Sequence, residues 1–258
     1  MSSAQRLIEV LALFTLKRPA WTPLAAAHAL GLSRASVYRY FLVLNESGYI
    51  IEVAGHQYAL GPRIVELDRQ IRLGDSLVQV AVDEMVKLAK ETGGVALLCR
   101  LYNQRVLCIH QERGTRLPGF VSYERGRAMP LYRGATSKVI LAFLPADELE
   151  VLVERDRGEV AGARLPRDGA ALRELLGPIR HERICIAYRE VDPDACGVAV
   201  PICDSSQVIG SLSNVLPAIE AKGRMLKTAC RLLVQAGVRI EADVEHAEAK
   251  RRRRKNGL

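Results

Sequence analysis

The chain has 258 residues, of which 49% are hydrophobic, and a formal net charge of +8 at pH 7. This composition excludes a mainly disordered protein, and no apolar run approaches the ~20 residues of a membrane-spanning helix. The N-terminus lacks a secretory signal pattern, so we expect a cytoplasmic protein with one small and one medium domain. The basic segment 250–255 carries six of the positive charges, which leaves 8 − 6 = +2 for the rest. Any affinity for nucleic acid is therefore expected to come from local arginines and helix N-termini.

The segment 21–49 has the pattern of two short helices joined by a tight turn. Thr22 followed by Pro23 is a favourable helix start, and Gly31 readily takes the positive φ that ends such a helix. Ser33 is placed to cap a second helix. Its apolar residues recur at helical spacing, at Val37, Tyr40, Phe41 and Leu44.

The opposite face of this second helix carries small, hydroxyl-bearing and basic side chains, as a recognition helix in the DNA major groove does. Two strand-like runs, 49–53 and 57–60, follow it around the short loop 54–56, which predicts a β-hairpin wing. A first helix with one apolar stripe supplies the third helix of a small core. An ordinary helical hairpin is the alternative for the two helices alone. The residues expected at the DNA are Thr22, Ser33, Arg34, Ala35, Ser36, Tyr38, Arg39 and His56.

A charged helix with a narrow apolar stripe follows the hairpin and ends at Gly74. The stripe, formed by Ile64, Leu67 and Ile71, is typical of a connector that also packs against a second subunit. The expected limits are 1–61 for a DNA-binding domain, 62–75 for a linker helix, 76–249 for a second domain and 250–258 for a disordered basic tail. The tail either attracts phosphates without sequence preference or only aids solubility.

Beyond Gly93 the periodicity changes to strands with interspersed helices. Strands are expected at 95–102, 105–111, 120–123, 197–203 and 208–215, with a hairpin turn at 103–104 and a loop at 204–206. Helices are expected at 137–144, 147–156, 170–181 and 219–248. Antiparallel strands with helices grouped on one side predict an α+β domain.

A turn containing Gly134, followed by small residues and a helix start, is the chemically most distinctive part of this domain. Such a turn presents several unpaired backbone N–H groups to an anion, and Arg133 would add a bidentate grip on a carboxylate. The alternatives are an ordinary Thr or Ser helix cap and an Arg133 that forms only a surface ion pair.

The sequence has no G-x-S-x-G, H-E-x-x-H, P-loop or G-x-G-x-x-G pattern, so we expect no catalytic residue. Its six cysteines form no C-x-x-C pair and no zinc spacing. We therefore expect reduced, buried thiols, no metal and no cofactor.

Taken together, these blocks resemble the IclR family of bacterial transcriptional regulators. The matching text lies at 6–11, 30–39, 48–50, 129–142 and 199–213. The resemblance implies a winged helix-turn-helix, a linker helix and a GAF-like domain that binds a small organic acid. It also implies dimers or tetramers on palindromic double-stranded DNA operators. In the effector pocket, it implies that the backbone amides of Ala135 and Thr136 hold the effector carboxylate and that Ser213 points toward it.

The chain departs from the family's small-acid binders at several positions. Ala187, Gly197 and Val215 stand where an aspartate, a cysteine and a second serine are common. Ser137 replaces a glycine, and Arg133 replaces a small residue. Fewer polar ligands and an added arginine favour a different acid, larger or aromatic. The expected effector residues are Arg133, Ala135, Thr136 and Ser213.

The expected function is therefore a DNA-binding regulator that responds to a small carboxylate effector, and not an enzyme. Two alternatives come from other classes. One is a GAF-like enzyme that uses a reactive cysteine, which paired cysteines in one pocket would support. The other is a general DNA-architectural protein, which the nearly neutral folded part and the large second domain disfavour.

Overall fold

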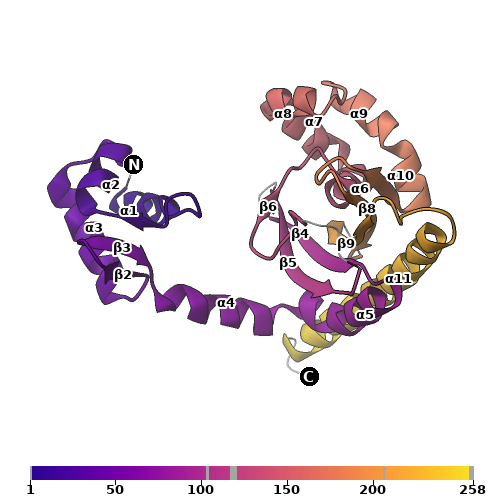
Figure 1. The fold of residues 1–258 in the computed structure, drawn as a ribbon, viewed down its shortest axis with the longest axis horizontal. Coiled ribbons are helices and arrows are strands. Elements are labelled where there is room, and N and C mark those ends of the chain that lie inside the picture. Colours follow the sequence, from indigo (N-terminus) through magenta and orange to yellow (C-terminus); the bar gives the residue numbers. More distant parts are fainter. Residues whose placement is uncertain (1, 103–104, 117–120, 206, 256–258) are drawn as a thin grey trace. The chain divides into compact units, whose positions relative to one another are not determined.

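The computed structural model describes residues 2–102, 105–116, 121–205 and 207–255. The chain forms two compact units, Met1–Gly74 and Asp75–Leu258, and each is described by itself (Figure 1). None of the helices in the described residues has the length and hydropathy that crossing a membrane requires.

The N-terminal unit combines short helices with a small antiparallel sheet (Figure 1). Its elements are α1 Ser3–Ala12, β1 Ala20–Trp21, α2 Pro23–Leu30, α3 Arg34–Glu46, β2 Ile50–Val53, β3 Gln57–Leu60 and α4 Pro62–Gly74. The strand order is β1-β3-β2. The helices α2 and α3 with the β2–β3 hairpin form the predicted winged helix-turn-helix. The strand β1 was not predicted, because two residues carry no periodicity.

Local signals determine where α2 and α3 begin and end. Thr22 Oγ1 accepts a hydrogen bond from Ala25 N at 3.2 Å, and Gly31 ends α2 at a φ of 64°. Ser33 Oγ caps α3 by accepting from the amide of Ser36 at 3.2 Å. The buried faces of the helices meet in one core, formed by Val10, Phe14, Trp21, Ala26, Ala27, Val37, Tyr40, Phe41, Leu44 and Ile50.

The C-terminal unit is built on one antiparallel sheet with the strand order β6-β5-β4-β9-β8-β7. Its strands are β4 Val95–Tyr102, β5 Arg105–Arg113, β6 Ala128–Met129, β7 Cys185–Tyr188, β8 Ala195–Cys203 and β9 Val208–Pro217. Its helices are α5 Ser76–Thr92, α6 Ala135–Phe143, α7 Ala146–Arg155, α8 Arg157–Gly162, α9 Gly169–Leu175, α10 Gly177–Glu182 and α11 Gly223–Lys255.

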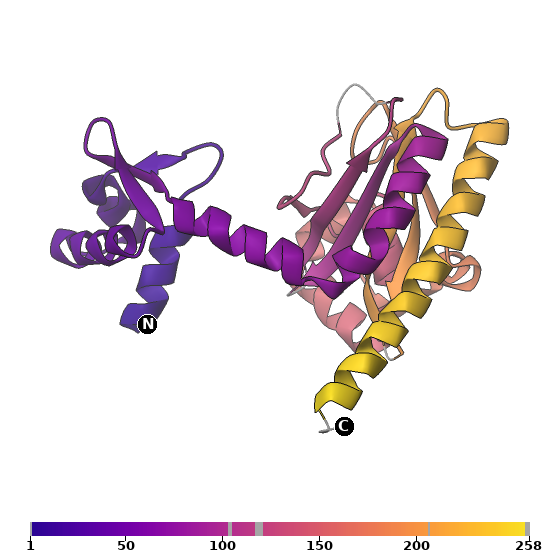
Figure 2. The same ribbon diagram turned by 90° about the horizontal axis from the view of Figure 1, so that it is seen from below.

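Helices cover both faces of this sheet, which corrects the expectation of helices on one side (Figure 2). α5 and α11 lie side by side on one face, and α6 with the helices that follow it packs on the other. Leu97 of β4 belongs to the core under α6, whereas its neighbours Ala96 and Leu98 belong to the core under α5 and α11. Strands that are apolar on both sides require two helical layers.

Two smaller expectations in this unit also fail. Residues 121–123 are irregular rather than a strand, because the amide and hydroxyl of Ser122 donate to the carboxylate of Asp192 instead of a neighbouring strand. The helix expected at 170–181 is two helices, α9 and α10, separated near Leu176. Pro178 lies in the first turn of α10, since its ring is tolerated at a helix start and not in the interior.

The last helix is longer than expected. It continues to Lys255, so residues 250–255 are helical rather than disordered. Arginine and lysine are good helix formers and favour the negative end of the helix dipole. The turn expected at 103–104, residue 120, Ser206 and the last three residues lie outside the described residues.

Candidate DNA interface and effector site

The outer face of α3 carries most of the residues expected at the DNA. The exposed ones are Ser33, Arg34, Ala35, Tyr38 and Arg39. Within the described residues, the guanidinium groups of Arg34 and Arg39 make no hydrogen bond or ion pair. Ser33 Oγ also donates to the half-buried Ser36 Oγ at 2.9 Å, so these hydroxyls stabilise the helix start as well as lining the surface.

An apolar hollow of about 400 Å³ lies between the starts of α2 and α3. It is lined by Pro23, Leu24, Arg34, Ala35 and Tyr38. The sequence did not single out Leu24 as a surface residue, because a leucine at helical spacing is normally buried, yet it is 45% exposed.

The other two expected DNA residues lie outside α3. Thr22 is half-buried and caps α2. His56 lies in the turn of the wing with a φ of 55°, and its Nδ1 is 3.2 Å from Glu52 Oε1.

In the C-terminal unit, α6 begins at the turn that the sequence predicted to bind an anion. Gly134 precedes the helix with a φ of 81°. The first intrahelical bond runs from Lys138 N to Gly134 O at 3.1 Å. The amides of Ala135 and Thr136 come before it, so they belong to the donors that a helix leaves unpaired at its positive end.

These two residues line a small cavity, which we name the α6 cavity, with a volume of about 30 Å³. Ala187, Gly197 and Val215 also line it. These are the three positions where the resemblance led us to expect polar groups that this chain lacks. A space of this size holds about two water molecules. An organic acid therefore fits only if part of the wall moves.

Tyr123 contributes an unsatisfied hydroxyl to the α6 cavity. The residue lines the cavity and is only 5% exposed, and its hydroxyl has no partner among the described residues. Burial raises the pKa of Tyr123, so the phenol keeps its proton and can donate. A buried hydroxyl without a partner costs roughly 1–3 kcal/mol, which a bound oxygen would remove. No pattern in the sequence marks this residue, which was expected in a strand.

Ser213 lies behind Thr136. Thr136 Oγ1 and Ser213 Oγ are 2.9 Å apart and both residues are buried. Ser211 Oγ also donates to Thr136 O at 3.2 Å. Ser213 therefore fixes the first turn of α6 instead of lining the α6 cavity.

A carboxylate of the chain itself lies at the start of α6. Gly134 N donates to Glu190 Oε2 at 3.0 Å, and Lys138 Nζ lies 2.6 Å from Glu190 Oε1. Asp192, which also lines the α6 cavity, accepts hydrogen bonds from Ser122. Glu190 and Asp192 come from the irregular segment between β7 and β8, where the sequence shows no periodic pattern.

The structure does not bring Arg133 into the α6 cavity. Its Nη2 donates to Gly162 O at 2.5 Å, and the side chain lines a neighbouring hollow of about 570 Å³. We name this space the arginine-lined hollow, after Arg105, Arg127, Arg133 and Arg155. Glu190 and Val191 line both spaces and so separate them.

All six cysteines are free thiols. Cys99 and Cys108 face each other on β4 and β5, and both are buried. A hydrogen bond with Cys108 and burial raise the pKa of Cys99, and the same contact lowers the pKa of Cys108. Neither thiol lines the α6 cavity, so this pair does not provide the pocket that an enzyme would need. In the described part of the chain, no cluster of His, Cys, Asp and Glu is arranged to hold a metal ion.

Known protein families match the N-terminal and the C-terminal part of the chain. Residues 3–52 match the IclR helix-turn-helix domain, and residues 74–241 match the family described as Bacterial transcriptional regulator IclR C-terminal. The transcriptional regulator KdgR of Escherichia coli is 26% identical over 216 residues, covering 83% of this chain and 81% of that protein. KipR of Bacillus subtilis is 23% identical over 196 residues, which cover 76% of this chain and 78% of KipR.

Solved structures share the fold. An IclR homolog from Microbacterium hydrocarbonoxydans, solved with 4-hydroxybenzoate, aligns with a TM-score of 0.78 at 23% identity over 95% of this chain and all of that chain. The IclR of Thermotoga maritima aligns with a TM-score of 0.69 at 20% identity, and the alignment covers 94% of this chain and 98% of that chain. The matched families and relatives are transcriptional regulators and not enzymes. The chain belongs to the IclR family of DNA-binding transcriptional regulators.

Proposed function

We propose that this regulator changes its affinity for a palindromic DNA operator when a small carboxylate acid binds in the α6 cavity. The observation that carries this proposal is the convergence of two kinds of donor on one cavity. The unpaired first-turn amides of Ala135 and Thr136 line it from α6. The hydroxyl of Tyr123, which has no partner among the described residues, comes from the segment before β6 and lies beside Gly134. A carboxylate is the small group that accepts hydrogen bonds from all three and is also favoured by the helix dipole.

The walls of the α6 cavity favour an acid with an apolar body. Ala187, Gly197 and Val215 offer no hydrogen-bonding side chain, so an aromatic or aliphatic group would pack there. The Microbacterium homolog was solved with 4-hydroxybenzoate, which supports testing aromatic acids first. Arg133 would then attract the acid through the arginine-lined hollow instead of gripping its carboxylate.

The DNA-binding part of the proposal rests on the free face of α3. Arg34 and Arg39 are available to phosphates and guanine edges, and the apolar hollow beside Ala35 and Tyr38 suits the methyl group of thymine. A single helix-turn-helix covers few base pairs, so we propose a homodimer or homotetramer that acts on two half-sites in the cytoplasm.

Fluorescence anisotropy with an operator that the protein itself selects from random DNA tests this function. Acids from a panel that includes 4-hydroxybenzoate are first ranked by the rise in melting temperature that they cause. The stabilising acid should change the operator affinity of the wild type by about tenfold, a typical coupling between two sites.

The matched variants are Gly197→Val and Gly177→Val. A side chain at Gly197 points toward the Cβ of Ala135, 3.5 Å from the added Cβ, so valine fills the α6 cavity. An added Cβ at Gly177 meets no atom within 4 Å. We expect Gly197→Val to bind the operator but to ignore the acid, and Gly177→Val to behave as the wild type does. A Gly197→Val protein that responds normally would contradict the proposed site.

A further inference from the structure

Glu190 occupies the anion-binding position at the start of α6. Its two carboxylate oxygens contact the amide of Gly134 at 3.0 Å and the ammonium of Lys138 at 2.6 Å. The amide of Gly134 directly precedes those of Ala135 and Thr136. An effector carboxylate on these amides would therefore lie beside the carboxylate of Glu190.

Two carboxylates at one helix terminus repel each other strongly. Lys138 balances one carboxylate, which Glu190 already provides, so only the partial positive charge of the helix end, roughly +0.5, is left for a second anion. The lysine is only 20% exposed, so solvent screens this position incompletely. A second anion cannot bind there on equal terms while Glu190 stays in place.

The volumes of the two neighbouring spaces also indicate that Glu190 must move before an organic acid binds. The α6 cavity measures about 30 Å³, whereas the arginine-lined hollow next to it measures about 570 Å³. Glu190 and Val191 form the wall between them. Movement of Glu190 out of its position would free the amide of Gly134 and also open the cavity to the larger space.

The arginine-lined hollow offers the displaced carboxylate new partners. Arg133 donates to the carbonyl of Gly162, and Arg127 donates to the carbonyl of Ser122 at 3.1 Å. Among the described residues, neither arginine has a carboxylate partner. Glu190 is 31% exposed on its side chain and already lines this hollow, so a rotation toward these guanidinium groups does not take it through the core.

We propose that Glu190 is an internal competitor of the effector: it occupies the start of α6 in the free protein and moves into the arginine-lined hollow when a carboxylate acid binds. This inference rests on the proposed function. Because an acid must first displace Glu190, its apparent affinity is lower than the open site would give. Only an acid that also gains the contacts to Tyr123 and the apolar walls binds well, so Glu190 sets the threshold and the selectivity of the response.

Chemical rescue by acetate tests the competition without knowledge of the effector. The full-length wild type, Glu190→Ala and Glu159→Ala are melted in acetate and in chloride of equal ionic strength. Glu159 is the matched control, because it also lines the arginine-lined hollow but does not contact α6. We expect acetate to raise the melting temperature of Glu190→Ala alone, by about 2–4 °C. Equal shifts in all three proteins, or a shift in none, would overturn the inference.

A second variant keeps the shape of the side chain. Glu190→Gln should bind 4-hydroxybenzoate, or another stabilising acid of the panel, about tenfold more tightly than the wild type in calorimetry, whereas Glu159→Gln should not. Unchanged affinity in Glu190→Gln counts against the inference. The Gly197→Val variant tests the proposed function separately. If Gly197→Val loses the acid response but acetate does not stabilise Glu190→Ala, the acid binds in the α6 cavity and Glu190 does not compete with it.

Discussion

Arg39 extends from the middle of the exposed face of α3 and has no ion-pair partner in the described residues. Its neighbours on that face, Ala35 and Tyr38, line an apolar hollow. A guanidinium beside apolar groups of this kind can read a guanine edge next to a thymine methyl group. We therefore propose that α3 carries sequence recognition and that the wing residue His56 has a lesser part in it.

Replacement of Arg39 by alanine should lower the affinity for the selected operator by about 5- to 150-fold, since one base contact is worth ~1–3 kcal/mol. Specificity should relax at one base pair. Anisotropy at fixed salt with operators substituted one position at a time measures both effects. Arg69→Ala removes the same charge from the exposed surface of α4 and serves as the control. Equal losses at every operator position would mean that Arg39 contacts only phosphate.

Among single residues, those with local signals were predictable from the sequence. Thr22, Gly31 and Ser33 are helix caps that depend only on their neighbours. Tyr123 and Glu190 were not, because each reaches α6 from an irregular segment and nothing near it in sequence marks that contact. Arg133 is close to the first-turn amides in sequence, but it precedes the turn at Gly134 and extends into the neighbouring hollow.

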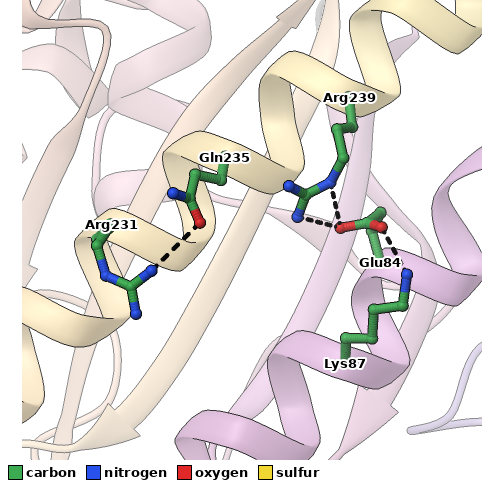
Figure 3. A network of polar contacts seen from close by, with 5 residues as sticks. All are labelled: Glu84, Lys87, Arg231, Gln235 and Arg239. Carbon is green, nitrogen blue, oxygen red and sulfur yellow. Dashed lines mark hydrogen bonds and ion pairs between the residues drawn. The ribbon is translucent and has the colours of Figure 1, made fainter.

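At the scale of elements, α5 and α11 are joined by a charged contact as well as by their apolar core. Glu84 of α5 accepts hydrogen bonds from Arg239 of α11 and from Lys87 of its own helix (Figure 3). Burial alone would raise the pKa of Glu84, but these hydrogen bonds outweigh it and hold the pKa below its usual value. Arg231 donates to Gln235, one turn further along α11, at 3.3 Å (Figure 3), and this is its one side-chain hydrogen bond within the described residues.

Arg239→Ala should therefore destabilise the C-terminal unit by about 1–2 kcal/mol at neutral pH, whereas Arg231→Ala should have little effect. Because the pKa of Glu84 is lowered in the folded state, its contribution is complete above the unfolded value and disappears as the pH falls through the folded value. The difference between wild type and Arg239→Ala should thus shrink from pH 7 toward pH 3.

Urea denaturation followed by circular dichroism measures this difference. The single tryptophan, Trp21, lies in the N-terminal unit, so its fluorescence transition should stay unchanged. A difference between wild type and Arg239→Ala that does not depend on pH would show that the arginine acts through packing alone.

The order of the elements was largely predictable, but their layering was not. Periodicity revealed the two helices of the helix-turn-helix, the wing and the long strands. It did not reveal that β4, β8 and β9 are covered on both faces, because a buried strand and a half-buried strand with small residues look alike in sequence. The elements β6, β7 and α8 were missed because they are too short to show a period.

At the scale of the whole molecule, the charge is concentrated at the C-terminal end. Segment 250–255 carries six positive charges out of a net +8. Removal of residues 250–258 should weaken binding to all DNA sequences by a similar factor and flatten its salt dependence, since these cations act on phosphates. Anisotropy over a salt series, with the operator and with scrambled DNA, measures both. A change in which operator bases matter would show instead that the segment reads sequence.

The regulator should also be at least a dimer. On α4, Ile71 is 60% exposed, which is unusual for an isoleucine without a partner. Light scattering at micromolar concentration should give at least twice the chain mass of 28.4 kDa. Ile71→Asp should shift the protein toward smaller species and weaken operator binding together. A monomeric wild type would contradict the two-half-site account.

The central claim is that the acid changes DNA binding by placing its carboxylate at the start of α6, where Glu190 lies in the free protein. A crystal structure of the protein with the acid that changes its operator affinity tests this most directly. The account predicts a carboxylate oxygen within hydrogen-bonding distance, ~2.7–3.2 Å, of the amides of Ala135 and Thr136. It also predicts Glu190 away from Gly134, among the arginines of the arginine-lined hollow. An acid bound elsewhere, with these amides untouched, would contradict it.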